Sequence, residues 1–354
     1  MPPFERLTID DVARLAQVSR TTASMVLTGQ AERYRIAPAT VERVKAVAAQ
    51  HHYVPSQSAR ALRSRKSRTL GLLIPELTNF AHASLAQALE VQSREAGYQL
   101  LIATSNDDAA QEAQGIAQLV AREVDGLIVV PASDQPERYE GWRARLPLVF
   151  ADRRIDASTI PFVVTDAAGV VAELAARAFA AAGLVEPAQA TRAVAPPRVA
   201  YFGGQATLSP SRDRLAGFRA ALQAAGLPEA DAGIVERDYR RESGRAMMAQ
   251  WRQQHGGTLP RVLFTGGIAL LEGVLADLQA SQQHGGRALA VPGQPLHLIT
   301  FDDHPLLDCL PLPVASIAQD ATGLARASLD AVLRLLRQEP AEPAWVPARI
   351  RLRG

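Results

Sequence analysis

Polar side chains that could bind a hydroxylated or phosphorylated ligand follow several apolar runs of the chain. Asp152 comes directly after LPLVFA, Arg214 follows RVAYFGG, and Asp302 comes directly after LHLITF. Other residues that follow such runs within a few positions are Leu77, Arg153, Arg154, Ser209, Arg212 and Gln319. Carboxylates accept hydrogen bonds from pairs of hydroxyl groups, whereas the planar guanidinium of arginine donates to hydroxyls or to phosphate. These residue types therefore indicate binding of a small polar molecule.

The elements that must position these side chains alternate between strand and helix patterns. Short apolar runs typical of strands lie at 69–75, 98–104, 124–131, 146–152, 162–166, 198–204, 261–267, 296–303 and 314–319. Helical patterns lie between many of them, for example at 81–96, 109–122, 214–226 and 268–280. Such alternation predicts an α/β fold with doubly wound parallel sheets, here in two successive halves. Ligands of such sheets bind at the carboxyl ends of the strands, where the polar residues lie.

Other chemistries have little support in the sequence. The pairs Gly203-Gly204 and Gly266-Gly267 extend to neither GxGxxG nor GxxxxGK[ST], the phosphate-binding patterns of dinucleotide and P-loop proteins. The seven histidines show no metal-ligand spacing, and no Ser/His/Asp set is discernible. We therefore expect no catalytic residues, no metal and no cofactor.

Charge is distributed unevenly along the 354 residues, although the net charge is only +2. Residues 1–68 hold 12 Lys/Arg against 5 Asp/Glu, while the remainder is mildly acidic. This asymmetry favours a polyanion as the partner of the N-terminal part, the alternative being a solvated basic tail. With a single cysteine, no signal-peptide pattern and no long apolar run, a cytoplasmic location is expected.

The basic N-terminal part contains the pattern of two short helices separated by a tight turn. Thr8 and Ser19 can cap the two helices, and Gln17-Val18 lies between them. This arrangement is typical of a helix-turn-helix, whose second helix would present Arg20 to guanine and Thr21 to a base edge or a phosphate. The alternative is an amphipathic helical hairpin with no DNA role. A third helix is expected from Pro38 to His51.

The blocks VARLAQVSRTTASMVLTG, TVERVKAVAAQHHYVP and ARALRSRKSRTLGLLIP resemble, in order and spacing, the head and hinge of the lactose-repressor (LacI) family. The segment ASMVLTGQAERYRI is most similar to the fructose-repressor members. The resemblance implies a DNA-binding transcription factor in which Leu62 inserts into the minor groove. Met25 departs from the aromatic residue of those members, which leaves the operator preference open. The DNA-binding positions implied are Thr8, Ser19, Arg20, Thr21, Thr22, Ser24, Met25, Tyr53 and Leu62.

The resemblance also implies a domain plan. Residues 1–56 would form the helix-turn-helix domain, 57–68 a hinge helix and linker, and 69–354 a periplasmic-binding-protein-like body that binds the effector and dimerises. Lobe 1 would comprise about 69–163 and 317–339, and lobe 2 about 164–316 and 340–354. A homodimer, or a dimer of dimers, would bind double-stranded operator DNA, to repress or also to activate.

The family pattern implies that Asp152, Arg214 and Asp302 bind sugar hydroxyls, with further contacts from Leu77, Arg153, Ser209, Arg212 and Gln319. The likeness to fructose repressors implies a phosphorylated ketose as effector, fructose 1-phosphate above all. Arg153, Arg154 or Arg212 could supply positive charge for its phosphate, although Arg154 and Arg212 could equally form surface ion pairs. Other readings are a family member that senses a different sugar, a sugar acid or a purine, a transport sugar-binding protein, and a sugar-phosphate enzyme.

Overall fold

The computed structural model describes residues 7–54, 66–185, 198–283, 290–291, 294–310, 312 and 314–353. The chain divides into two compact units, Met1–Ser67 and Arg68–Gly354, here called the head and the body. Leu62, the expected minor-groove residue, lies outside the described residues.

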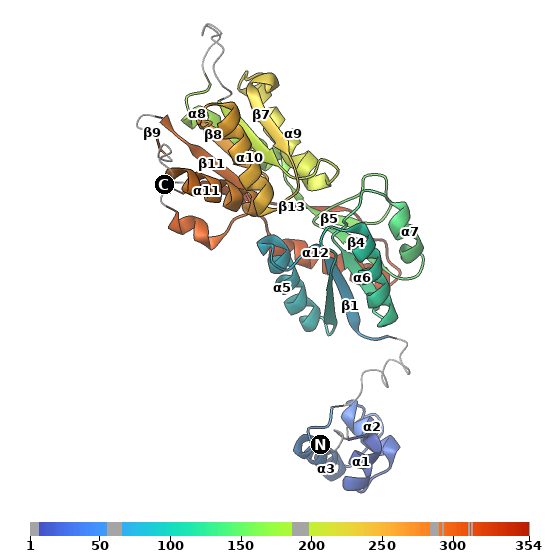
Figure 1. Cartoon of the computed structure of the whole chain (residues 1–354). Coiled ribbons are helices and arrows are strands. Elements are labelled where there is room, and N and C mark those ends of the chain that lie inside the picture. The colour runs from blue at the N-terminus through green and yellow to red at the C-terminus, as the bar shows by residue number, and fades with distance from the viewer. Residues whose placement is uncertain are drawn as a thin grey trace. The chain divides into compact units, whose positions relative to one another are not determined.

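The head contains three helices around a small core: α1 (Ile9–Leu15), α2 (Arg20–Leu27) and α3 (Pro38–Gln50) (Figure 1). As expected, Thr8 caps α1, in a capping box with Asp11, and Ser19 caps α2 by accepting a hydrogen bond from the Thr22 amide. Val12, Ala23 and Val44, one from each helix, are fully buried and hold the three helices together.

The body consists of two lobes, each built on a six-stranded sheet with helices on both faces (Figure 1). The lobe 1 sheet has the order β13-β5-β4-β3-β1-β2, and all of its strand pairs are parallel. Its strands are β1 (Thr69–Ile74), β2 (Gln99–Thr104), β3 (Gly126–Val129), β4 (Leu148–Ala151), β5 (Phe162–Asp166) and β13 (Ala344–Pro347). The helices of lobe 1 are α5 (Phe80–Glu95), α6 (Ala109–Ala121), α7 (Glu137–Arg143) and α12 (Ala321–Leu336).

Lobe 2 repeats this plan with the order β14-β12-β11-β8-β6-β7, in which only the β12–β14 pair is antiparallel. Its strands are β6 (Val199–Gly203), β7 (Ala232–Glu236), β8 (Val262–Thr265), β11 (His297–Phe301), β12 (Val314–Ala318) and β14 (Arg349–Arg351). Its helices are α8 (Ala168–Ala181), α9 (Ser209–Ala224), α10 (Arg241–Gln254) and α11 (Ile268–Gln283). The short elements η1 (Glu229–Asp231), β9 (Ala290–Val291), β10 (Gln294–Pro295) and η2 (Pro305–Cys309) complete the body.

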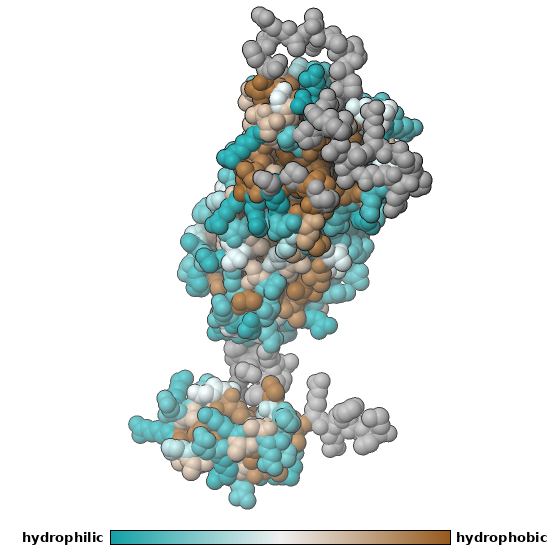
Figure 2. All heavy atoms as spheres, turned by 90° about the vertical axis from the view of Figure 1, so that its left-hand side faces the viewer, coloured by the Kyte–Doolittle hydropathy of each residue, from teal (hydrophilic) through white to brown (hydrophobic). Residues whose placement is uncertain are grey.

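Both sheets are buried on their two faces, which explains the uninterrupted apolar runs of the sequence. Every residue of β1, β3, β4, β6 and β8 is buried, as expected for central parallel strands covered by helices. Figure 2 shows that the visible surface of each unit is largely hydrophilic, with smaller hydrophobic areas interspersed. Among the described residues, none of the helices has the length and apolar content needed to cross a membrane.

The chain crosses between the lobes three times: after β5, after β12 and between β13 and β14. The expected lobe boundaries were therefore wrong at the C-terminal end. Strand β13 was expected in lobe 2 but pairs with β5 of lobe 1, and β12 belongs to lobe 2 up to Ala318. The helix expected at 214–226 begins earlier, at Ser209.

Candidate effector and DNA-binding sites

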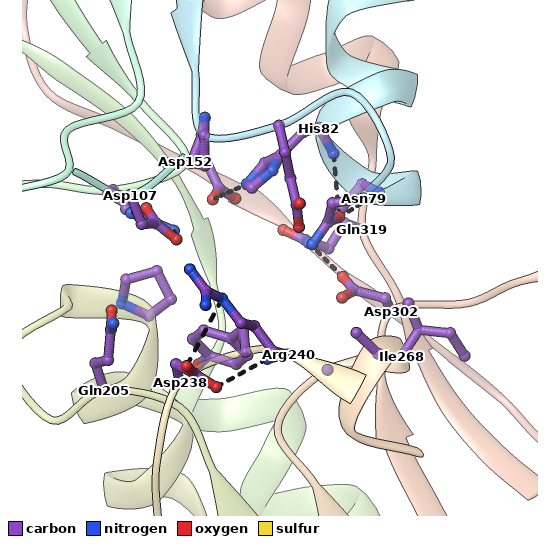
Figure 3. Close-up of a pocket in the computed structure, with 18 of the residues that line it drawn as sticks. Asn79, His82, Asp107, Asp152, Gln205, Asp238, Arg240, Ile268, Asp302 and Gln319 are labelled. Atoms are coloured by element: carbon purple, nitrogen blue, oxygen red, sulfur yellow. Dashed lines mark hydrogen bonds and ion pairs between the residues drawn. The ribbon is translucent and has the colours of Figure 1, made fainter. Parts of the chain in front are cut away.

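A cavity of about 270 Å³ lies between the two lobes, at the carboxyl ends of the strands. Figure 3 shows residues of both lobes around it, with His82 and Asp152 from lobe 1 and Asp238 and Arg240 from lobe 2. The lining is largely polar and charged: Pro75, Glu76, Asn79, Ala81, His82, Asn106, Asp107, Asp152, Arg153, Gln205, Pro210, Arg214, Asp238, Tyr239, Arg240, Gly267, Ile268, Ala269, Asp302 and Gln319. Such a cavity suits a small, highly hydroxylated molecule.

Asp152 and Asp302 take equivalent positions in the two lobes. Asp152 directly follows β4 and Asp302 directly follows β11, and these strands are third from the same edge in their sheets. Both residues have left-handed backbone conformations, with φ of 62° and 70°. Residues other than glycine rarely adopt this backbone conformation, and when they do, they are often found at functional sites. Each lobe thus contributes one carboxylate in this strained position to the cavity.

In lobe 1, the surroundings of Asp152 are fixed by buried polar contacts. His82 Nε2 lies 3.9 Å from Asp152 Oδ2, and burial lowers the pKa of this histidine, which favours its neutral form. Asn79 caps α5 and so positions the turn that carries His82. Arg153 is buried and forms a two-pronged ion pair with Asp107, at 2.5 and 3.3 Å, which anchors the residue that follows Asp152.

In lobe 2, Arg214 is buried beneath the cavity. Its Nη1 donates to the carbonyl oxygen of Gly266 at 2.5 Å, and its guanidinium carbon lies 3.7 Å from the centre of the Phe301 ring. Asp302 accepts a hydrogen bond of 2.6 Å from Gln319 Nε2. The Thr165 hydroxyl of lobe 1 donates to Gln319 Oε1. Burial raises the pKa of Asp302, while the positive charge of Arg214 opposes that rise.

The cavity brings together five of the eight effector-binding residues expected from the sequence: Asp152, Arg153, Arg214, Asp302 and Gln319. The other three do not line it. Leu77 is half exposed on the surface, the Ser209 hydroxyl accepts a hydrogen bond from the Arg154 amide, and Arg212 forms an ion pair with Asp156.

Arg154, a further candidate for phosphate binding, is also engaged elsewhere. It forms two hydrogen bonds with Asp213 of α9, at 2.5 and 3.0 Å, and one with Asp156. With the Arg212–Asp156 pair, these contacts join lobe 1 to lobe 2 beside the cavity, and we call the four residues the lobe clamp. Arg154 and Arg212 thus form ion pairs with neighbouring carboxylates, which was the alternative to phosphate binding considered for both residues.

Several lining residues were not identified from the sequence. His82 lies in the first turn of α5, on the buried face of an ordinary amphipathic helix. Tyr239 and Arg240 precede α10, a helix that the sequence analysis did not predict. Candidate residues were sought in the turn that follows each predicted strand. Strand β7, which precedes these two residues, was not predicted because its positions are only half-buried and form no clear apolar run.

The head presents the second helix of its helix-turn-helix to the surroundings. Arg20 and Thr21 are exposed at the start of α2, and Arg20 lies 3.5 Å from Asp10. Ser24 and Met25 are partly exposed, Thr8 and Ser19 serve as caps, Thr22 hydrogen-bonds Ser19, and Tyr53 packs against the head core. The arrangement can place α2 in a DNA major groove.

Family comparisons agree with this division of the chain. Residues 8–56 match the model of bacterial regulatory proteins of the lacI family, and residues 67–267 match that of periplasmic binding proteins and the sugar-binding domain of the LacI family. Residues 197–354 match a periplasmic binding protein-like domain.

The chain is also similar to curated repressors over almost its full length. It is 38% identical to the sucrose operon repressor of Klebsiella pneumoniae, over 99% of this chain and 98% of that protein. It is 37% identical to the catabolite repressor/activator of Escherichia coli K12, over 95% and 93% of the two chains. The two identities are too close to decide which of these two regulators the chain resembles more.

Two solved structures have the same fold. The Cra transcriptional dual regulator of Pseudomonas putida, in complex with fructose 1-phosphate, matches with a TM-score of 0.69 and 32% identity, over 81% of this chain and 99% of that chain. The lac repressor dimer bound to operator and an anti-inducer matches with a TM-score of 0.78 and 21% identity, over 98% of each chain.

A helix-turn-helix head joined to a two-lobed periplasmic-binding-protein-like body defines a DNA-binding regulator controlled by a small ligand. The chain belongs to the LacI family. It is a sugar-responsive transcriptional repressor of that family and not an enzyme.

Proposed function

We propose that this repressor controls genes of fructose and central carbon metabolism and is released from its operator by fructose 1-phosphate or a related sugar phosphate. The observation that carries the proposal is the cavity between the lobes, where Asp152 and Asp302 can accept hydrogen bonds from sugar hydroxyls beside three arginines. The 32% identical regulator in complex with fructose 1-phosphate supports this choice of ligand.

On the DNA side, the protein acts in the cytoplasm as a homodimer. Two heads related by two-fold symmetry bind two half-sites of a near-palindromic operator. The roles proposed are base contacts by Arg20, Thr21 and Met25, insertion of Leu62 into the minor groove, and backbone or positioning contacts by the remaining head residues named from the sequence. The dimer bound to operator in the lac repressor structure supports this assembly.

Control by the effector follows from a shift between two lobe arrangements. The effector binds one arrangement more tightly, and that arrangement holds the two heads in a spacing unsuited to the operator. Operator affinity falls by the ratio of the effector's affinities for the two arrangements.

The test is release of DNA by the ligand. An operator selected from random-sequence DNA by the protein itself is bound at fixed concentration, and fructose 1-phosphate is titrated while binding is followed by fluorescence anisotropy. The proposal predicts loss of operator binding, with no effect of fructose or inorganic phosphate at the same concentration. Unchanged operator affinity at saturating fructose 1-phosphate would refute the choice of effector.

A second candidate effector is sucrose, because the chain is 38% identical to a sucrose operon repressor. Sucrose carries no phosphate, so the two candidates differ in their demand for positive charge in the cavity. A thermal-shift comparison of sucrose, fructose and fructose 1-phosphate separates them, since a ligand at 100 times its Kd stabilises the folded body by about 2.7 kcal/mol.

A further inference from the structure

The three arginines that line the cavity differ in how firmly contacts with other residues hold their side chains in place. Arg153 is buried and held by Asp107 and by the carbonyl oxygen of Pro131. Arg240 is two-thirds exposed, with 67% of its side-chain surface accessible, and its ion pair with Asp238 is long, at 3.7 Å. Figure 3 shows its side chain reaching from lobe 2 into the space between the lobes. Arg240 can therefore turn to a ligand anion at little cost.

A helix N-terminus lies beside Arg240. Helix α11 begins at Ile268, and Gly267, Ile268 and Ala269 all line the cavity. The amides of a first helical turn have no partner within the helix, and the helix dipole makes this end electropositive. The backbones of α10 and α11 touch here, because a Cβ placed on Gly244 would lie 2.1 Å from the carbonyl oxygen of Leu270. The start of α10, whose N-cap is Arg240, is thus next to the start of α11.

A buried arginine in the same wall has one donor without a partner. Arg214 is only 6% exposed, and it lines the cavity. Its Nη1 is bonded to Gly266 and Tyr239, but its Nε has no hydrogen-bond partner among the described residues. A buried guanidinium with an unused donor costs free energy, and the negative charge of a ligand in the cavity would offset part of that cost.

We propose that lobe 2 contains a phosphate subsite formed by the Arg240 guanidinium and the N-terminal amides of α11, with Arg214 supplying positive charge from behind. This inference rests on the proposed function and deepens it, because it assigns the residue that distinguishes a phosphorylated sugar from a free one. The sugar hydroxyls are left to Asp152, on lobe 1, and to Asp302 (Figure 3). Asp302 Oδ2 lies beside the start of α11, 3.6 Å from where a Cβ on Gly267 would stand, so it faces the hydroxyls nearest the phosphate.

The nearby carboxylate of Asp238 remains satisfied when Arg240 turns away from it. Asp238 Oδ1 accepts hydrogen bonds from the Ser243 hydroxyl and from the Arg240 amide, the latter at 3.3 Å. Its side chain still competes with phosphate for Arg240. Asp238→Asn keeps the two acceptor contacts and removes the competing charge, so this variant is expected to bind phosphate more tightly.

The test compares Arg240→Gln with Arg241→Gln. Arg241 is the adjacent arginine, which is exposed and does not line the cavity. Binding of fructose 1-phosphate to the full-length dimer is measured by calorimetry. Loss of a charge-assisted contact to phosphate predicts binding about 10- to 100-fold weaker for Arg240→Gln and unchanged within about twofold for Arg241→Gln.

Stabilisation by inorganic phosphate alone, measured by thermal shift, separates the subsite from the choice of effector. Phosphate is expected to raise the Tm of the wild type and of Arg241→Gln more than that of Arg240→Gln. If fructose 1-phosphate does not bind the wild type but this phosphate difference persists, the proposed effector is wrong and the subsite stands. If Arg240→Gln matches the wild type with both probes, or the wild type responds to neither, the subsite is overturned.

Discussion

Replacing Asp302 with asparagine should weaken effector binding and leave operator binding intact. Asp302 Oδ1 is already bonded to Gln319, and an asparagine oxygen can keep that bond. The other carboxylate oxygen is available to a ligand, and an asparagine amide there could not accept hydrogen bonds. Hydrogen bonds to a charged group contribute roughly 1.5–3 kcal/mol each, so one lost contact weakens effector binding by about 10- to 150-fold.

The stability of the body should change in the opposite direction. Burial raises the pKa of Asp302 above its value in the unfolded chain, so its ionised form costs folding free energy at neutral pH. Asp302→Asn removes this cost. The advantage of the variant is present above the raised folded pKa and disappears as the pH falls through it, because the wild-type carboxyl then takes up a proton in the folded state.

The assay is calorimetric titration with fructose 1-phosphate, alongside thermal unfolding at several pH values. Asp330→Asn is the control, because Asp330 is an exposed carboxylate of α12 that does not line the cavity. Operator affinity without effector should equal that of the wild type. Effector binding by Asp302→Asn within threefold of the wild type would refute the role assigned to this carboxylate.

Two further perturbations address the lobe clamp and the hinge. Asp213→Asn removes the charge that pairs with Arg154 across the lobes, in a partly exposed ion pair at 2.5 Å. Loss of about 1 kcal/mol should weaken effector binding by about fivefold and make that binding less sensitive to NaCl. Unchanged effector binding at all salt concentrations would contradict the lobe clamp. Leu62→Ala should reduce operator bending and weaken operator binding by a few kcal/mol at most. Bending is measured by energy transfer between dyes at the two ends of the DNA. Bending equal to that of the wild type would show that Leu62 does not insert into the minor groove.

The sequence predicted most of the fold because its central strands are uninterrupted apolar runs. It located β1, β3, β4, β6 and β8 for this reason. It did not predict α7 and β7, which are short and have no clear apolar run. It also missed α10, although the buried residues Met247, Met248 and Trp251 recur there at helical spacing. Nor could it assign β13 to lobe 1, since the pairing of β13 with β5 joins segments far apart in the chain and depends on tertiary structure.

The same distinction applies to the cavity. Asp152 and Asp302 could be found because each directly follows a buried strand, and parallel strands end at one edge of a sheet. Arg212 and Arg214 were both expected in the cavity, although residues two apart on a helix point roughly 200° away from each other. The helix was predicted only from residue 214, so Arg212 was assigned to no helical face. In the structure, Arg214 enters the cavity while Arg212 belongs to the clamp. Arg240 was missed because the helix that it precedes was not predicted.

The most direct test of ligand control is the affinity of the repressor for fructose 1-phosphate, measured with and without saturating operator DNA. Because coupling between two binding sites is reciprocal, a ligand that weakens operator binding must itself be bound more weakly by the operator complex, by the same factor. We expect a higher Kd for fructose 1-phosphate in the presence of operator, by the same factor as the ligand-induced loss of operator affinity. Equal Kd values in the two conditions would contradict it.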